Sequence, residues 1–414
     1  SRIMRWAALP TLLLLSLGCS LLGVAPSTPV VSSPTPQPEP TITPAPPTPT
    51  LAPTSPPLSV EDVCPPLDAV TPPERSAVLD DDLEALSVFL SAGGDVSAFP
   101  LQEQEASLRG DITGDGIEEI VFTLIDPQSE LIPPRTVMVI YTCREGRMTV
   151  LYRYEPGEWF GLQLITTADL TQDGVSELVF SEFSCGAHTC VHMPKAWSWQ
   201  GGDFENRMGA EFSFPYPDFT VDSGELVVVS SGVGSVGAGP QRSVTTWMGW
   251  TAEIITITNE VPAPPTYRYH AFLDGEVAFA AGDYTTADAA YTRTIDDDSL
   301  EPWGAFSGVE AEREWFIALA HWRLMMLEAF QDRSQEAEVH LDYLMDLDSG
   351  SAGYPVVSLA ERFWRAYERD GDAAAACEYG VDTPQGQPVL DFLNGFGYAN
   401  PFYEQHHLCI VPEQ

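Results

Sequence analysis

Residues 109–122 read RGDITGDGIEEIVF and residues 167–180 read TADLTQDGVSELVF, so nearly the same segment occurs twice in the chain. Each copy begins with an acidic turn, in which Gly116 or Gly174 permits a sharp bend. Each copy ends in Ile-Val-Phe or Leu-Val-Phe, and such runs are typical of strands. The repeat therefore predicts an all-β region in which each acidic turn leads directly into a strand.

Each acidic turn also carries oxygen-bearing side chains at alternate positions. Because alternate residues of a tight loop point inward, they predict a cage of hard oxygen ligands, which suits Ca²⁺. The alternative is an acidic turn between strands that binds no ion. Phe122 and Phe180 stand where a helix–loop–helix calcium loop needs its last Glu. The expected ligands are Asp111, Thr113, Asp115, the carbonyl of Ile117 and Glu119 in one loop, and Asp169, Thr171, Asp173, the carbonyl of Val175 and Glu177 in the other.

On these residues the two segments resemble the FG-GAP and VCBS repeats. The resemblance implies strands arranged as β-propeller blades, joined by loops that bind Ca²⁺. Thr stands at position 3, where the family has Asn or Asp, and Glu stands at position 9 in place of Asp. A neutral hydroxyl weakens a calcium site, so we expect dissociation constants of about 10⁻⁴ to 10⁻³ M.

A third copy of the repeat is degraded. Residues 219–229 keep the Gly-Glu-Leu-Val core but lose most of the ligand positions. We therefore expect about three propeller-like blades with two metal loops. Propellers normally have at least four blades, so the domain should stay open or partial. Its remaining edge could be covered by the helical stretch 80–92 or by a partner.

After residue 262 the apolar spacing changes to that of helices. Gly275, Tyr284, Ala287 and Tyr291 resemble a tetratricopeptide repeat, and looser copies follow at 312–346 and 357–379. The resemblance implies stacked helix pairs with a concave face that binds a protein or peptide. The alternative is a helical cap with a purely structural role.

The amino end predicts export. Arg2 and Arg5 precede an apolar run, and the following Gly-Cys resembles the lipobox of bacterial lipoproteins, which implies that Cys19 carries lipid. An uncleaved membrane anchor is the alternative. Residues 25–59 are rich in Pro, Thr and Ser, so they predict an extended stalk rather than a core. A Pro-rich ligand for a partner protein is the competing interpretation of this stretch.

Six further cysteines fit an oxidising compartment, where an even number indicates disulfides. Proximity in the sequence favours two of the pairs, and the third follows by elimination. A zinc site at Cys185, His188, Cys190 and His192 is the less favoured alternative, because its ligand spacing is tight. The expected pairs are Cys185 with Cys190, Cys377 with Cys409, and Cys64 with Cys143.

The charge balance excludes one class of partner. The chain of 414 residues has 19 basic and 60 acidic residues, for a net charge of −41, and such a chain repels nucleic acid. Gly-x-Gly-x-x-Gly at 232–237 is followed by strand-like sequence instead of a helix, so we expect a flexible loop and no nucleotide.

Together these patterns predict a multidomain protein. Its expected function is that of a non-enzymatic scaffold, anchored outside the cytoplasm through Cys19, which binds Ca²⁺ and a protein or polymer partner. The alternative is an exported hydrolase or solute-binding component with its site on the β domain. The expected segments are a signal peptide (1–18), a disordered stalk (19–60), a β repeat domain (61–262), a helical domain (263–384) and a tail (385–414).

Overall fold

The computed structural model describes residues 64, 70–186, 188–304 and 308–412. The expected signal peptide, the lipidation site at Cys19 and the stalk lie outside these residues. The described residues all belong to one compact unit.

A membrane-crossing helix would have to be both long and apolar. Among the residues just given, no helix meets these two conditions.

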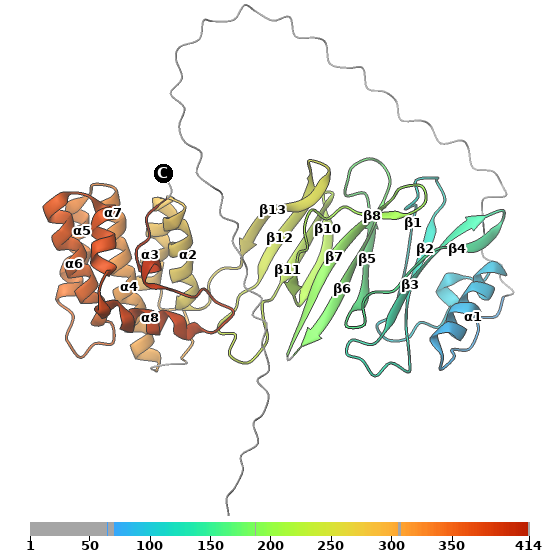
Figure 1. The fold of residues 1–414 in the computed structure, drawn as a ribbon, viewed down its shortest axis with the longest axis horizontal. Coiled ribbons are helices and arrows are strands. Elements are labelled where there is room, and N and C mark those ends of the chain that lie inside the picture. Colours follow the sequence, from blue (N-terminus) through green and yellow to red (C-terminus); the bar gives the residue numbers. More distant parts are fainter. Residues whose placement is uncertain (1–63, 65–69, 187, 305–307, 413–414) are drawn as a thin grey trace, which may run out of the picture. The chain divides into compact units, whose positions relative to one another are not determined.

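The first part of this unit consists of three antiparallel sheets, each running through its strands in sequence order (Figure 1). A short additional strand, β9 (Phe214–Pro215), pairs with β7. The described strands form no closed barrel. The first sheet contains β1 (Ala106–Gly110), β2 (Glu119–Ile125), β3 (Thr136–Arg144) and β4 (Arg147–Tyr154); the second contains β5 (Gly161–Ala168), β6 (Glu177–Gly186), β7 (Thr189–Trp199) and β8 (Phe204–Asn206); the third contains β10 (Pro217–Asp222), β11 (Glu225–Ser230), β12 (Val244–Thr251) and β13 (Ile254–Pro262).

The three sheets pack face to face, because successive side chains of a strand point to opposite faces. In β6, Phe180 packs toward the first sheet and Val179 toward the third. In β2, Val121 packs toward the second sheet, while Phe122 packs against helix α1 (Leu79–Ser91). Helix α1 therefore covers the outer face of the first sheet, which explains why β2 is apolar on both sides.

Seven α-helices follow β13 in the described residues, so the predicted order of a β region before a helical region is confirmed. Consecutive helices pack as the pairs α2–α3, α4–α5 and α6–α7. Gly275 is required in the first pair, because a Cβ atom there would lie 2.4 Å from the Tyr291 ring. The helices are α2 (Arg268–Ala280), α3 (Tyr284–Asp296), α4 (Val309–Phe330), α5 (Ser334–Met345), α6 (Pro355–Asp370), α7 (Ala373–Val381) and α8 (Gln387–Leu393).

The residues expected to form a tail contribute to the helical core. Val389, Phe392, Phe396 and Leu408 are buried in the same apolar cluster as Phe316 of α4. The segment from Val389 to Leu408 is thus packed against the helices and not only attached to them by a disulfide.

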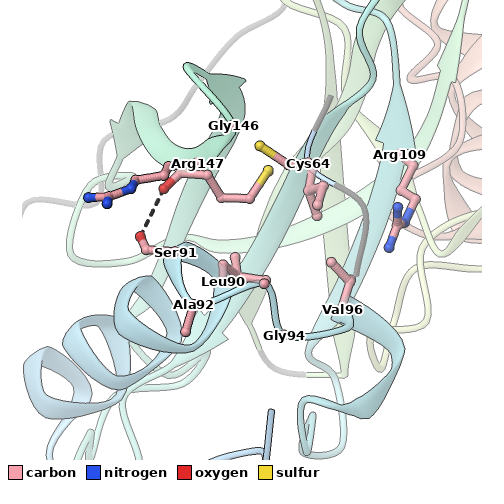
Figure 2. Close-up of a pocket in the computed structure, with 12 residues that line it drawn as sticks. Cys64, Leu90, Ser91, Ala92, Gly94, Val96, Arg109, Gly146 and Arg147 are labelled. Atoms are coloured by element: carbon pink, nitrogen blue, oxygen red, sulfur yellow. Dashed lines mark hydrogen bonds between the residues drawn. The ribbon is translucent and has the colours of Figure 1, made fainter. Parts of the chain in front are cut away.

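Three disulfides cross-link the unit, and they are the three pairs expected from the sequence: Cys64–Cys143, Cys185–Cys190 and Cys377–Cys409. Because Cys185 and Cys190 are bonded to each other, their sulfurs are not free to bind zinc. Figure 2 shows Cys64 beside Leu90 and Gly146, at a cavity of about 230 Å³ between α1 and the β3–β4 turn.

Candidate functional site: two acidic loops

The two acidic loops occupy equivalent places in consecutive sheets. Residues 111–118 connect β1 to β2, and residues 169–176 connect β5 to β6. Gly116 and Gly174 both have positive φ angles, of 87° and 91°, as the sharp bend requires. The sequence repeat is therefore also a repeat of position in the sheets.

The Glu119 carboxylate closes the first loop from the inside. Its Oε2 accepts hydrogen bonds from the backbone N–H groups of Ile112 (3.0 Å) and Thr113 (3.1 Å). Its Oε1 accepts bonds from the hydroxyls of Thr142 on β3 (2.9 Å) and Thr113 (3.3 Å). Glu119 is fully buried, so its carboxylate points into the protein and away from the loop surface.

Glu177 makes the same four contacts in the second loop. Its Oε2 accepts from the N–H groups of Leu170 (2.8 Å) and Thr171 (3.1 Å). Its Oε1 accepts from the hydroxyls of Thr171 (3.1 Å) and Ser198 on β7 (2.8 Å). We call this arrangement of Glu, Thr and a strand hydroxyl the clasp. Both departures from the FG-GAP and VCBS pattern, Thr at position 3 and Glu at position 9, are partners within it.

The aspartates hold the outer part of each loop. Asp111 accepts hydrogen bonds from the N–H groups of Gly114 (2.7 Å) and Gly116 (2.9 Å), and Asp115 accepts one from Ile117 (2.9 Å). In the other loop, Asp169 accepts hydrogen bonds from the N–H groups of Asp173 (3.1 Å) and Gly174 (3.0 Å), and Asp173 accepts one from Val175 (2.9 Å). A carboxylate has about four acceptor positions, so these aspartates keep lone pairs for a cation.

The two loops also contact each other. The Ser176 N–H donates a hydrogen bond to the Asp111 carbonyl (3.3 Å), and beside the loops the Thr167 hydroxyl of β5 donates one to the Arg109 carbonyl of β1 (2.9 Å). A Cβ atom at Gly114 would lie 2.8 Å from the Val175 side chain. The four loop aspartates, which are exposed or half-buried, therefore lie on adjacent loops.

Burial raises the pKa of the Glu119 carboxyl to about 7, and the negative charge of Asp115 adds to the rise. The hydrogen bonds from Thr142 and the loop backbone act in the opposite direction, because they stabilise the charged form. Near neutral pH the Glu119 carboxyl is therefore protonated in some molecules and charged in others.

Fewer oxygen ligands are left for calcium than the sequence predicts. Glu119 and Glu177 each accept four hydrogen bonds from the protein, so their carboxylates are not free to bind an ion. Of the expected ligands, each loop keeps two aspartates, one threonine hydroxyl oxygen and one carbonyl oxygen. Nowhere in residues 64, 70–186, 188–304 and 308–412 do three or more His, Cys, Asp or Glu side chains form a group that could hold a metal ion. Calcium takes six to eight oxygen ligands, so these oxygens fit only a weak site in which water molecules supply the remaining ligands.

The degraded third copy forms no such loop. Asp222 pairs directly with Glu225 across a two-residue turn, in which Ser223 and Gly224 both have positive φ. This turn leaves no segment to surround an ion.

Sequence reasoning missed the hydroxyl partners of the clasps, Thr142 and Ser198. They lie 23 and 21 residues beyond the Glu residues that they bind, on strands that pair with β2 and β6. No local pattern marks them, because only the strand pairing brings them to the loops.

Comparison with models of known protein families gave no match, and no curated protein searched is significantly similar to the chain.

Proposed function

We propose that this protein is a non-enzymatic scaffold, anchored outside the cytoplasm through Cys19, whose folded unit binds a protein or polymer partner. The observation that carries the proposal is an open groove of about 770 Å³ along α2 and α3. Residues 261–265, which are rich in proline, form one wall of the groove.

The groove is suited to a partner chain because its surface is apolar and accessible. Ala271 and Ala278 of α2 and Ala290 of α3 line it, and Val277 on α2 is 72% exposed. At the rim, Arg242 and Asp274 form an ion pair. An apolar surface with charged groups at its edge is the usual composition of a protein interface.

A photo-crosslinking amino acid in place of Val277 tests this function in the full-length protein on intact cells. We expect a discrete crosslinked species from position 277. The same substitution at Val88, an exposed valine on α1, should give none. Equal crosslinking from both positions, or none from position 277, would contradict the proposed function.

We further propose that both acidic loops bind Ca²⁺ weakly, and that this stiffens the contact between the first two sheets. With a dissociation constant of about 1 mM, Ca²⁺ at about 10 mM should stabilise the fold by roughly 1.4 kcal/mol per site. The melting temperature should therefore rise by a few degrees, as measured by circular dichroism against a sample in chelator.

Asp115→Ala together with Asp173→Ala should abolish this calcium-dependent shift. The matched control is Glu211→Ala with Asp218→Ala, which removes two exposed acidic charges outside the loops. The control should keep the shift. If both double variants respond to calcium as the parent does, the loops are not the calcium sites.

A further inference from the structure

A second hollow, of about 700 Å³, lies where the loop between β11 and β12 meets the segment after α8. Three aromatic residues, two asparagines, four glycines and one proline line it. The glycine-rich sequence 232–237, which matches a dinucleotide fingerprint, ends at this hollow and belongs to a loop.

Backbone hydrogen bonds hold the two walls of the hollow together. The N–H of Tyr398 donates to the Gly237 carbonyl (3.1 Å), and the N–H of Ala399 donates to the Ala238 carbonyl (3.3 Å). A Cβ atom at Gly239 would lie 1.6 Å from the Phe396 carbonyl oxygen, so only glycine allows this approach. The walls are therefore positioned before any ligand arrives.

The Asn400 side chain crosses between the walls. Its Nδ2 donates to the carbonyl oxygens of Phe396 (2.7 Å), Ala238 (3.1 Å) and Pro240 (3.2 Å). These bonds fix the orientation of the carboxamide. Within the described part of the chain, its Oδ1 accepts no hydrogen bond and remains available to a ligand.

The aromatic rings of the hollow are unusually accessible. Trp303 is 39% exposed, Tyr398 66% and Phe402 71%. Trp303 is supported by Tyr267, whose ring packs edge-on at 5.7 Å. Three large exposed rings around one concavity form an apolar patch of the kind that marks a binding site.

The charge of the hollow restricts its ligand. Although charged residues make up 19% of the chain, none of the described residues that line this hollow is charged. By contrast, Arg242, Asp274 and Arg293 lie at the groove along α2 and α3. An anion would find no positive partner here and a metal ion no carboxylate, so the surface favours an uncharged ligand.

We propose that this hollow binds a neutral oligosaccharide. Sugar rings are uncharged, present C–H faces that pack on aromatic rings, and carry hydroxyls that bond to carboxamides and to the Tyr398 hydroxyl. The cavity volume lies within the range of about 300 to 1,000 Å³ that is typical of ligand sites. This inference goes beyond the groove along α2 and α3, because it assigns a glycan to a separate site.

Calorimetry on the full chain tests the proposal with neutral tetrasaccharides of glucose and of N-acetylglucosamine. We expect at least one of them to bind, and a tetramer of galacturonate, which is anionic, to bind at least tenfold more weakly. Phe402→Ala and Tyr398→Ala should each weaken binding about tenfold. Trp159→Ala, which removes an exposed aromatic ring outside the hollow, should leave it unchanged.

Absence of binding by all neutral probes, or equal binding by Phe402→Ala and the parent, would overturn the proposal. If sugars do not bind but Phe402→Ala abolishes the crosslink from position 277, the hollow contributes to a protein interface instead. If the protein without further substitutions binds sugar but gives no crosslink from position 277, only the groove function is overturned. The two failures are therefore distinguishable.

Discussion

Replacing Arg323 with methionine should lower the free energy of unfolding by about 3 to 5 kcal/mol. Arg323 of α4 is fully buried and forms two parallel bonds with Glu276 of α2, Nε to Oε1 at 2.7 Å and Nη2 to Oε2 at 2.8 Å. Without Arg323, the buried Glu276 carboxylate loses its positive partner, and burial of an unpaired charge is strongly unfavourable. Urea unfolding followed by circular dichroism measures the loss.

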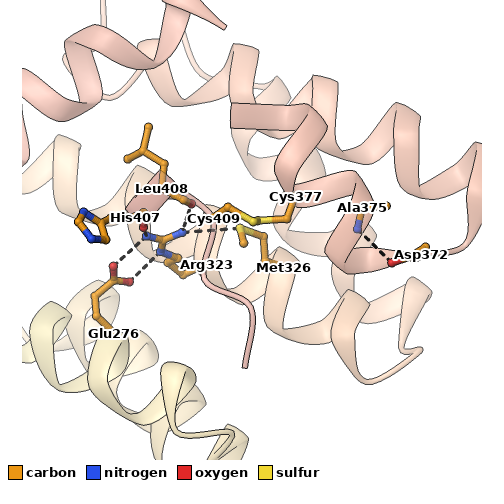
Figure 3. The surroundings of a disulfide bond; sticks show 9 residues. All are labelled: Glu276, Arg323, Met326, Asp372, Ala375, Cys377, His407, Leu408 and Cys409. Carbon is orange, nitrogen blue, oxygen red and sulfur yellow. Dashed lines mark hydrogen bonds and ion pairs between the residues drawn. A yellow bond between two sulfur atoms is a disulfide. The ribbon is translucent and has the colours of Figure 1, made fainter. Parts of the chain in front are cut away.

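The same arginine also holds the carboxyl-terminal segment. Its Nη1 donates to the Leu408 carbonyl at 2.6 Å, next to the Cys377–Cys409 disulfide (Figure 3). The Tyr291 hydroxyl donates to Glu276 at 2.8 Å, so α2, α3, α4 and the terminal segment meet at one ion pair. The disulfide alone does not replace these bonds, and we expect the loss with the disulfide intact.

A double variant separates the charge effect from the packing effect. Arg323→Met with Glu276→Leu removes both charges, so it should recover most of the stability that Arg323→Met loses. The control is Arg365→Met, because Arg365 forms an exposed ion pair with Glu361, and such pairs contribute less than about 1 kcal/mol. Equal losses in Arg323→Met and Arg365→Met would contradict the assigned role.

Replacing Glu119 with glutamine should change how stability depends on pH. Since the folded carboxyl has a pKa of about 7 and its ordinary value is 4.5, the folded state holds the proton more tightly. The parent protein therefore gains stability from this group below about pH 4.5 and loses it as the pH rises through 7. Between these limits the loss amounts to about 3 kcal/mol.

Glutamine resembles the protonated carboxyl and does not titrate. The stability of Glu119→Gln relative to the parent should therefore increase by about 3 kcal/mol between about pH 4.5 and pH 8. Urea unfolding in chelator at several pH values measures this difference. Glu119→Ala should be less stable than Glu119→Gln throughout, because it leaves the buried loop donors without an acceptor. A stability difference between Glu119→Gln and the parent that does not change with pH would contradict the raised pKa.

Much of the architecture was predictable because it depends on local patterns. Strand chemistry after each acidic turn indicated the sheets, and the change of apolar spacing after residue 262 indicated the helices. The structure confirms three antiparallel sheets followed by a helical region. The three disulfide pairs could also be predicted, since short sequence separation favoured two of them. Propeller-like blades, tetratricopeptide-like repeats and calcium remain predictions.

The candidate site was less predictable. The sequence placed Glu119 and Glu177 among the loop oxygens, but it carried no information about the direction in which they point. In the structure both turn inward, because Thr142 and Ser198 offer hydroxyls from the neighbouring strands. In the same way, the glycines at 232–237 indicated a flexible loop, and only the folded chain brings the carboxyl-terminal segment onto Gly237 and the adjoining residues.

The sequence by itself determined where the chain turns and which stretches become strands or helices, because these depend on glycine, acidic side chains and apolar spacing within a few residues. Tertiary structure alone decided which groups satisfy the two glutamates, how tightly Glu119 holds its proton, and which aromatic rings surround one hollow. Burial and hydrogen-bond partners depend on residues that are distant in the sequence, so no local pattern contains them.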